Sequence, residues 1–267
     1  LGRRPAQAGG PQVTALLEVK GVRKAFGGVV ALDDVSFAVE QGCIAAVIGP
    51  NGAGKTTLFK VVSGMYPPTR GQVWFEGRLL NGTPPYARAG LGIAHTFQNV
   101  QLFGNMTALE NVMAGRYPRS RCGVLEAALR TPRLRREEED IYLKAVHYLN
   151  MVGLGTRARE NAASLPFGQQ KLVAIGRALA TEPRLLLLDE PASGLNSLEK
   201  SDLSDLIHRT REMGITIILV EHDMELVMGI AEFVVVLDHG QKIAEGKPSQ
   251  VQRDRRVITA YLGEDSE

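Results

Sequence analysis

Short runs of consecutive apolar residues recur along the chain, each bounded by glycine or by polar residues. Such runs are typical of strands that are buried on both faces of a parallel sheet. The clearest are 44–48, 185–188, 216–220 and 233–237. Further strands are predicted at 16–19 and 35–39, which flank a turn at Gly27-Gly28, at 72–76, within 90–98, and at 242–244, which pairs with 233–237 as a hairpin.

Between these strands, apolar positions recur at helical spacing. The expected helices are 58–62, 107–114, 141–152, 168–179, a segment around 203–207, and the tail 248–262. The start at Thr107 depends on a capping box formed with Glu110. Residues 117–140 break the pattern with Pro132, an arginine cluster and an acidic run, so an irregular insertion is predicted there. The alternation indicates an α/β fold, either one domain or a core with an inserted subdomain.

A glycine-rich stretch between the strand 44–48 and the helix 58–62 carries the most specific chemistry. It consists of Gly49, Pro50, Asn51, Gly52, Ala53, Gly54, Lys55, Thr56 and Thr57, and it fits the phosphate-loop pattern G-x-x-x-x-G-K-[ST]. The glycines let backbone N–H groups approach phosphate oxygens, and the following helix adds its positive N-terminal dipole. Lys55 can reach terminal phosphates and Thr56 can ligate Mg²⁺. A glycine turn with a chance Lys-Thr pair is the alternative, which the flanking strand and helix disfavour.

Polar residues directly follow two of the buried strands. Asp189 and Glu190 follow 185–188, and His222 follows 216–220. An ordinary polar strand end explains the two carboxylates equally well in isolation, and His222 can be a surface histidine. Beside a phosphate loop, however, Asp189 can hold Mg²⁺ and Glu190 can orient and deprotonate water. Phe26 either fills the core or stacks on a purine ring.

Composition excludes several classes of protein. A net charge of +2 with 22% charged residues gives no basic excess for binding nucleic acid. Cys43 and Cys122 belong to no metal-ligand pattern and are expected to be reduced thiols. The longest apolar runs fall far below the roughly 20 residues that cross a bilayer. Residues 1–13 are expected to be a disordered leader, and residues 263–267 to fray.

Taken together, the motifs resemble those of ATP-binding cassette ATPases from about Leu16 to Gly263. Phe26 matches the adenine-stacking aromatic of that family, and residues 49–57 match its Walker A loop. Gln98 matches the glutamine that senses Mg²⁺ and the membrane partner, residues 185–190 match Walker B with its catalytic glutamate, residues 192–196 the D-loop, and His222 the switch histidine. In that family the metal site would comprise Thr56, Gln98 and Asp189.

The resemblance implies a P-loop NTPase (RecA-like) core with an N-terminal antiparallel β subdomain and an inserted helical subdomain. On this basis residues 14–263 form one domain. Its α/β core with the β subdomain comprises 14–97 and 180–247, the helical subdomain 98–179 carries the insertion 117–140, and a C-terminal helix spans 248–263.

The family signature, commonly Leu-Ser-Gly-Gly-Gln, is altered here. The corresponding residues are Leu165, Pro166, Phe167, Gly168 and Gln169. Proline supplies neither a hydroxyl nor a backbone donor, so the usual serine contact with a γ-phosphate is lost. Gly168 and the following helix N-terminus can still cap a phosphate of the opposing subunit. We therefore expect a weakened half-site that still functions.

Further features are similar to the G-type ATPase of branched-chain amino-acid importers. They are the altered signature followed by Gln169-Gln170, the opening Phe26-Gly27-Gly28, the arginine-rich insertion, Glu221-His222-Asp223-Met224 and the ending Ala260-Tyr261-Leu262-Gly263. This resemblance implies a second ATPase subunit, either an F-type paralogue or a second copy, two membrane-spanning permease subunits, and indirectly a periplasmic binding protein. The chain would then lie on the cytoplasmic face of the inner membrane.

Other readings stay open at this point. Closely similar ATPases serve urea and short-chain amide importers. A lipid or lipopolysaccharide exporter ATPase would be expected to keep the serine-glycine signature, and a soluble cassette of DNA repair or translation usually has two cassettes or long insertions. A P-loop kinase or GTPase leaves the series Gln98, Gly168 and His222 unexplained.

Overall fold

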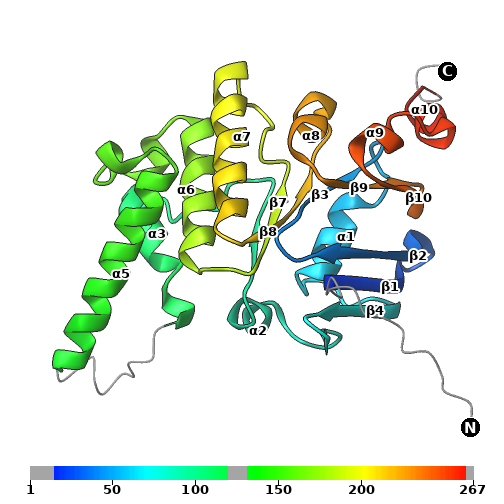
Figure 1. Ribbon diagram of the computed structural model, residues 1–267. Coiled ribbons are helices and arrows are strands. Elements are labelled where there is room, and N and C mark those ends of the chain that lie inside the picture. The colour runs from blue at the N-terminus through cyan, green and yellow to red at the C-terminus, as the bar shows by residue number, and fades with distance from the viewer. Residues whose placement is uncertain (1–14, 120–130, 263–267) are drawn as a thin grey trace, which may run out of the picture.

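Two sheets and a group of helices make up the protein (Figure 1), which is seen here in a computed structural model that describes residues 15–119 and 131–262. Within these residues, the larger sheet has six strands in the order β10-β9-β3-β8-β7-β6. They are β3 (Ile44–Ile48), β6 (Ile93–Thr96), β7 (Leu185–Asp189), β8 (Thr216–Val220), β9 (Phe233–Asp238) and β10 (Gln241–Gly246). All neighbouring pairs are parallel except the hairpin of β9 and β10, which confirms the predicted buried runs and the hairpin.

The apolar runs are continuous because strands of this sheet are covered on both faces. In β3, for example, Ala45 and Val47 pack into one hydrophobic core, whereas Ile44, Ala46 and Ile48 pack into another. The first core lies between the two sheets and includes α1 (Lys55–Val62). The second joins the sheet to the helices on its other face.

The smaller sheet is antiparallel, in the order β2-β1-β4-β5. Its strands are β1 (Ala15–Phe26), β2 (Val29–Glu40), β4 (Arg70–Phe75) and β5 (Arg78–Leu79). The predicted turn at Gly27-Gly28 is confirmed, but β1 and β2 are much longer than the predicted 16–19 and 35–39. Several register shifts interrupt their pairing. Because such irregularities break strict alternation, the periodic signal covers only part of each strand.

Helices α3, α5 and α6 pack against one another at one side of the larger sheet, drawn in green in Figure 1. Within the described residues, the helices beyond α1 are α2 (Pro85–Gly90), α3 (Ala108–Ala114), α5 (Pro132–Met151), α6 (Phe167–Ala180), α7 (Ser197–Glu212), α8 (Met224–Ile230), α9 (Pro248–Val251) and α10 (Arg255–Leu262). Short 3₁₀ turns lie at Tyr117–Arg119, Gly155–Arg157 and Ala162–Ser164. The capping box predicted at Thr107 and Glu110 is present. Among the described residues, no helix has both the length and the apolar character needed to cross a membrane.

Two helical predictions were wrong. Helix α5 begins at Pro132, so the part of the predicted irregular insertion from 132 to 140 is regular helix. Proline occupies the first turn, where its missing N–H is not needed, and Thr131 caps the helix by accepting a bond from the Leu134 N–H at 3.3 Å. The expected single helix 248–263 is instead two helices, α9 and α10, and Asp254 caps the second by accepting a bond from the Arg256 N–H.

Several predictions concern residues that the structure does not describe, and one concerns residues that are exposed. The leader 1–13, Cys122, Arg130 and the end 263–267 are not described. The remaining members of the arginine cluster, Arg133, Arg135 and Arg136, are exposed on the first turns of α5, as a solvated helix face would be.

Arg88 of α2 fixes the end of the helix that begins at Lys55. Its side chain is buried and donates to the carbonyl oxygens of Val61 and Val62, at 2.9 and 2.6 Å, in the last turn of α1. It also donates to the carbonyls of Leu80 and Thr83. Burial lowers the pKa of Arg88 to about 10, so it stays charged at neutral pH. A cation at this position also complements the negative end of the helix dipole.

We predict that Arg88→Met destabilises the fold. It removes the donors of four carbonyls, at a cost of about 2–4 kcal/mol, and a chain of this size should then melt roughly 5–10 °C lower. Thermal unfolding followed by circular dichroism measures this, with Arg253→Met, an exposed position, as the control. Equal melting temperatures for the two variants would show that the cap does not stabilise α1.

Candidate functional site

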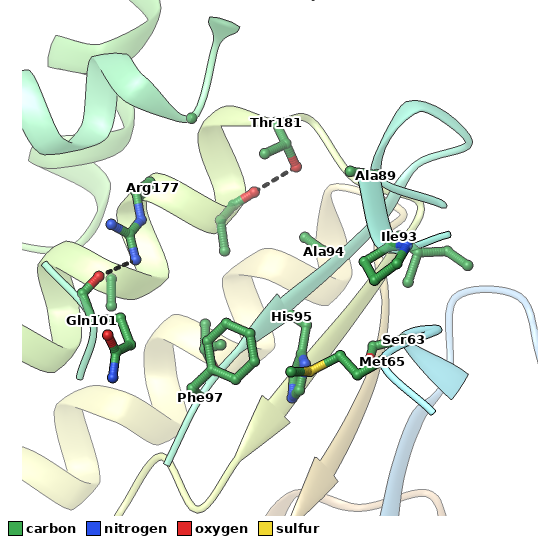
Figure 2. Close-up of a pocket in the computed structure, with 15 residues that line it drawn as sticks. Ser63, Met65, Ala89, Ile93, Ala94, His95, Phe97, Gln101, Arg177 and Thr181 are labelled. Carbon is green, nitrogen blue, oxygen red and sulfur yellow. Dashed lines mark hydrogen bonds between the residues drawn. The ribbon is translucent and has the colours of Figure 1, made fainter. Parts of the chain in front are cut away.

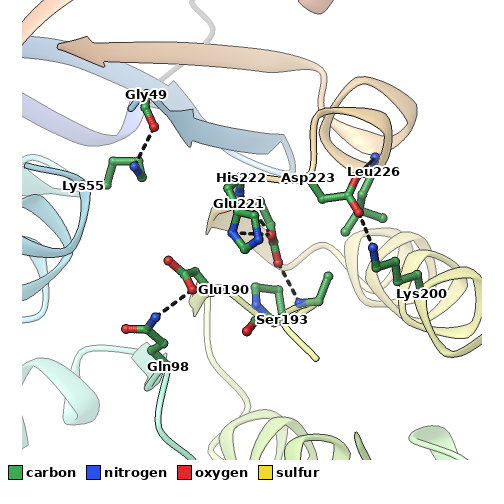
Figure 3. A network of polar contacts seen from close by, with 12 residues as sticks. Gly49, Lys55, Gln98, Glu190, Ser193, Lys200, Glu221, His222, Asp223 and Leu226 are labelled. Atoms are coloured by element: carbon green, nitrogen blue, oxygen red, sulfur yellow. Dashed lines mark hydrogen bonds and ion pairs between the residues drawn. The ribbon is translucent and has the colours of Figure 1, made fainter. Parts of the chain in front are cut away.

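The predicted functional residues gather where parallel strands end. The order β3-β8-β7-β6 places four carboxyl ends side by side. The phosphate loop follows β3, His222 follows β8, Asp189 and Glu190 lie at the end of β7, and Gln98 follows β6. Figure 3 shows how Lys55, Gln98, Glu190 and His222 lie relative to one another at this edge. Ligands of open α/β sheets bind at such edges.

The phosphate loop is packed so tightly that two of its positions require glycine. At Gly49, where φ is +148°, a Cβ atom would lie 2.0 Å from the Leu237 carbonyl oxygen. At Gly54, where φ is +99°, it would lie 2.6 Å from the Ala31 carbonyl oxygen. The buried Lys55 ammonium lies inside the loop and donates to the carbonyls of Gly49 and Pro50, at 2.6 and 2.7 Å. The loop therefore has a fixed shape around its lysine.

Gln98 and Glu190 are in direct contact. The Gln98 Nε2 atom donates to Glu190 Oε2 at 2.7 Å, so the side chains meet across the ends of β6 and β7. Glu190 has a left-handed backbone, with φ of +47°, and its N–H donates to the Val220 carbonyl at 2.9 Å. Such a conformation costs a residue other than glycine about 1–3 kcal/mol, and it turns the chain sharply after the strand.

Asp189 is the buried acid of the site. Asp189 is only 5% exposed, and its Oδ1 atom has no hydrogen-bond partner among the described residues. Burial, and then the charge of Glu190, raise the pKa of Asp189 to about 6. A buried carboxylate oxygen without a partner is the donor chemistry that a hard divalent cation satisfies.

Two buried charges that sequence reasoning missed hold the turn after Glu190. The Lys171 ammonium donates to the carbonyls of Glu190, Pro191 and Ser193. The Glu221 carboxylate accepts bonds from the N–H groups of Ala192 and His222, at 2.6 and 3.2 Å. The sequence did hold a signal for Lys171 that we did not use: a lysine on the apolar face of the predicted helix 168–179 indicates a buried charge.

His222 extends from the sheet edge toward solvent. Its side chain is 62% exposed, and its Nδ1 atom is 3.8 Å from Glu221 Oε2. The next residue, Asp223, caps α8 by accepting a bond from the Leu226 N–H and binds the Lys200 ammonium (Figure 3). The backbone at His222 is thus anchored on both sides while its ring stays accessible.

Phe26 does not fill the core, since 42% of it is exposed at the tip of β1. Its ring meets Tyr66 edge-on, with 5.1 Å between the centroids. The Lys24 ammonium lies 4.8 Å from the Phe26 centroid and donates to the Pro67 carbonyl at 2.9 Å. Sequence reasoning missed Tyr66 and Lys24, which together with Phe26 form an aromatic and basic surface.

The altered signature lies against the chain that follows Glu190. Leu165 is buried, Pro166 precedes α6, and Phe167, Gly168 and Gln169 form the first turn of that helix. A Cβ atom on Gly194 would lie 3.3 Å from the Phe167 ring, and one on Gly168 would lie 2.8 Å from Glu199 Oε1. The contacts of the signature therefore run to residues 194–199.

A cleft of about 270 Å³ opens beside the end of β6 (Figure 2). Its lining comes from α2, β6, α6 and the segment that leads to Gln98, and includes Met65, Phe97, Gln101 and Arg177. The ring nitrogens of His95 have no hydrogen-bond partner in the described residues, and burial lowers the pKa of His95 to about 4. His95 is therefore neutral at neutral pH, and the mainly apolar wall of the cleft carries the cation Arg177, which donates to the Gln101 carbonyl.

A phosphate loop on a parallel sheet, with acidic and histidine side chains at the adjacent strand ends, defines a P-loop nucleotide-binding protein. The family model described as ABC transporter matches residues 32–193, and one described as Branched-chain amino acid ATP-binding cassette transporter matches residues 241–267. The chain is 42% identical to the high-affinity branched-chain amino acid transport ATP-binding protein BraF of Pseudomonas aeruginosa, over 93% of this chain and 98% of that protein. It is 40% identical to LivG of Escherichia coli, with the same coverage.

Solved structures of ATP-binding cassettes have the same fold as this chain. A nucleotide-free ATP-binding cassette from an ABC transporter superposes with a TM-score of 0.81 at 32% identity, covering 93% of this chain and 99% of that one. The ADP conformation of MJ1267, an ATP-binding cassette of an ABC transporter, gives 0.81 at 33% identity, covering 94% and 99%. The chain therefore belongs to the ATP-binding cassette transporter family and has its fold. Proteins of this class bind ATP and hydrolyse it to drive transport.

We predict that Asp189→Asn stabilises the nucleotide-free chain at about pH 8. A carboxyl whose pKa rises from 3.8 to about 6 on folding is destabilising when ionised, and this penalty declines as the pH falls below about 6 and is lost near 3.8. The gain should be at most about 3 kcal/mol and should shrink toward zero near pH 4. Denaturant unfolding at both pH values measures it, with the exposed Asp205→Asn as the control. A gain independent of pH would contradict the assignment.

Proposed function

We propose that this chain is the ATP-hydrolysing subunit of an importer for branched-chain amino acids. The observation that carries the proposal is the match of residues 241–267 to the family model of branched-chain amino acid cassettes. Identities of 42% and 40% with BraF and LivG over almost the whole chain support it. An importer of urea or short-chain amides is the alternative substrate class.

In this proposal the nucleotide extends from Phe26 to the strand ends. The Phe26 ring stacks on adenine, and the loop Gly49-Pro50-Asn51-Gly52-Ala53-Gly54 presents its backbone to the phosphates together with Lys55, Thr56 and Thr57. Thr56, Asp189 and Gln98 would hold Mg²⁺, for which the unpartnered Asp189 oxygen is the main support. A bound Mg²⁺ would neutralise charge on the phosphates as the terminal phosphoryl group leaves.

Glu190 would act as the general base. Its carboxylate would take a proton from the attacking water, and the Gln98 amide at 2.7 Å would keep that carboxylate in place. His222, which is exposed at the adjacent strand end, would contact the terminal phosphate. Lys55 would offset the charge that develops on the phosphoryl oxygens.

A second cassette would complete the site. On the basis of the family resemblance, Leu165, Phe167, Gly168 and Gln169 face the nucleotide of the opposing subunit, so two cassettes enclose two ATP molecules. One chain of the dimeric structure of the cassette MJ0796 bound to ADP and Pi superposes on this chain with a TM-score of 0.75 at 27% identity. The loss of the signature serine favours an F-type paralogue over a second copy as the partner.

The cleft beside β6 is the surface that we assign to the permease. The cleft lies between the helical group and the core (Figure 2). Its lining includes Phe97, the neighbour of Gln98, so a permease segment bound there would be in contact with residues that move with the nucleotide site. The chain would lie at the cytoplasmic face of the inner membrane beneath two permease subunits, which a periplasmic binding protein supplies. No nucleic acid takes part.

We predict that Glu190→Gln binds ATP normally but hydrolyses it at least about 100-fold more slowly, because the base is lost. It should accumulate as a closed, ATP-bound dimer. Lys55→Ala should lose nucleotide binding or turnover. Phosphate release, ATP binding and light scattering are measured on the purified complex, with the exposed Glu225→Gln as the control. Wild-type hydrolysis by either site variant would refute the assignment.

We also predict the partners of the chain. A tagged chain, recovered from gently solubilised native membranes, should co-purify with two multi-span permease subunits, a second cassette ATPase and a leucine-type binding protein, as mass spectrometry can identify. Urea-type partners would keep the mechanism and change the substrate. Recovery of soluble or nucleic-acid partners alone would contradict the transport function.

A further inference from the structure

We propose that Lys171 and Glu221 are positioning residues that hold the general base Glu190 through the backbone of the turn from Glu190 to Ser193. This inference rests on the proposed role of Glu190. The turn begins in the left-handed conformation of Glu190, and the Ser193 N–H donates back to the Glu190 carbonyl at 3.3 Å. The Glu190 N–H donates to the Val220 carbonyl, and two buried side chains of opposite charge bind further backbone groups of the turn.

The Lys171 ammonium binds the carbonyl side of the turn. Its three acceptors are the oxygens of Glu190 at 3.0 Å, Pro191 at 3.3 Å and Ser193 at 2.5 Å. Lys171 is 6% exposed, and within the described part of the chain it forms no ion pair with a carboxylate. Burial lowers its pKa, with Glu221 and Glu190 acting in the opposite direction. Its charge is therefore used on backbone dipoles.

The Glu221 carboxylate binds the amide side. It is fully buried and accepts a bond from the Ala192 N–H at 2.6 Å, in the middle of the turn. Its second oxygen accepts from the His222 N–H. Burying a carboxylate is costly unless its oxygens are satisfied, and both oxygens here bind backbone N–H groups.

These contacts tie three functional segments to one turn. Lys171 lies one helical turn after Phe167, and its ammonium is 5.3 Å from the Phe167 ring centroid. Glu221 directly precedes His222. Helix α6 thus cannot shift relative to Glu190 without breaking three hydrogen bonds, so engagement of the signature by an opposing subunit is transmitted to the base of the same chain.

A purely structural role makes a different prediction. Lys171→Met leaves three carbonyl oxygens without their donor, so a role in stability alone would lower the melting temperature and leave kcat of the folded protein unchanged. A positioning role also lowers the rate of the chemical step, because ATP binds through the phosphate loop and Phe26, which Lys171 does not touch in the hydrogen bonds described for it.

The test measures kcat and KM for ATP, together with the melting temperature, on the full-length chain in its purified complex. Lys171→Met should lower kcat at least about 10-fold and change KM by less than about 2-fold. Lys171→Arg, which keeps a cation with several donors, should recover most of kcat. Glu221→Gln should lower kcat with the same unchanged KM. Lys20→Met, on the exposed side of β1, is the matched control.

A double variant separates the inference from its premise. If Lys171 acts through Glu190, then adding Lys171→Met to Glu190→Gln should cost less than about 2-fold more in single-turnover hydrolysis. The inference would be overturned if the double variant showed the product of the two single losses in rate. It would also be overturned if kcat were unchanged in Lys171→Met, or if Lys171→Arg failed to recover activity. The proposed function would stand in each of these cases. Wild-type activity in Glu190→Gln alone would overturn both.

Discussion

Close packing around the phosphate loop connects the two sheets of this protein. The loop passes between the end of β9 and the strand β2, where the Leu237 and Ala31 carbonyls leave no room for a side chain at Gly49 or Gly54. Gly240, in the hairpin turn after β9, donates to the Ala53 carbonyl and accepts from the Asp33 N–H. These contacts fix the position of the loop relative to both the parallel and the antiparallel sheet. Since Phe26 ends β1, the same packing sets its distance from the phosphate loop.

Buried charge serves two different purposes in this protein. Arg88 is buried far from any reacting group and bonds only to backbone carbonyls, so it stabilises α1. Asp189, by contrast, keeps an unpartnered oxygen and a raised pKa, which is a cost to the fold. Perturbed acids of this kind are typical of functional sites. Both residues are buried, so for this pair it is the hydrogen bonds that separate the structural charge from the functional one.

Local patterns predicted most of the fold and named most of the residues that the strand ends bring together. The phosphate loop and the residues at the strand ends were found because each depends on a few consecutive residues. The contact between Gln98 and Glu190 was not predicted, since it depends on β6 lying next to β7 in the sheet. The partners of Lys171 and Glu221 could not be predicted, because both side chains bind backbone atoms and the residue types of the turn do not encode such bonds.

The start of α5 shows how one residue type can mislead. Pro132 was interpreted as an interruption because proline breaks helix interiors, yet it is also favoured in the first turn. A capping residue directly before the proline distinguishes the start of a helix from an interruption. Thr131 is that residue here. The lengths of β1 and β2 were underestimated for a related reason, because their irregular register hides the period of two.

Proline in the signature changes what α6 can offer to an opposing nucleotide. Pro166 has neither hydroxyl nor N–H, so the donors that remain are backbone N–H groups of the first turn of α6. Backbone donors move only with the whole helix, unlike a serine side chain that can rotate. In the proposed assembly, capture of the opposing phosphate would therefore depend on the position of α6. Because Lys171 fixes that position relative to Glu190, the half-site that this chain completes and the base that it contains would be mechanically coupled through one helix.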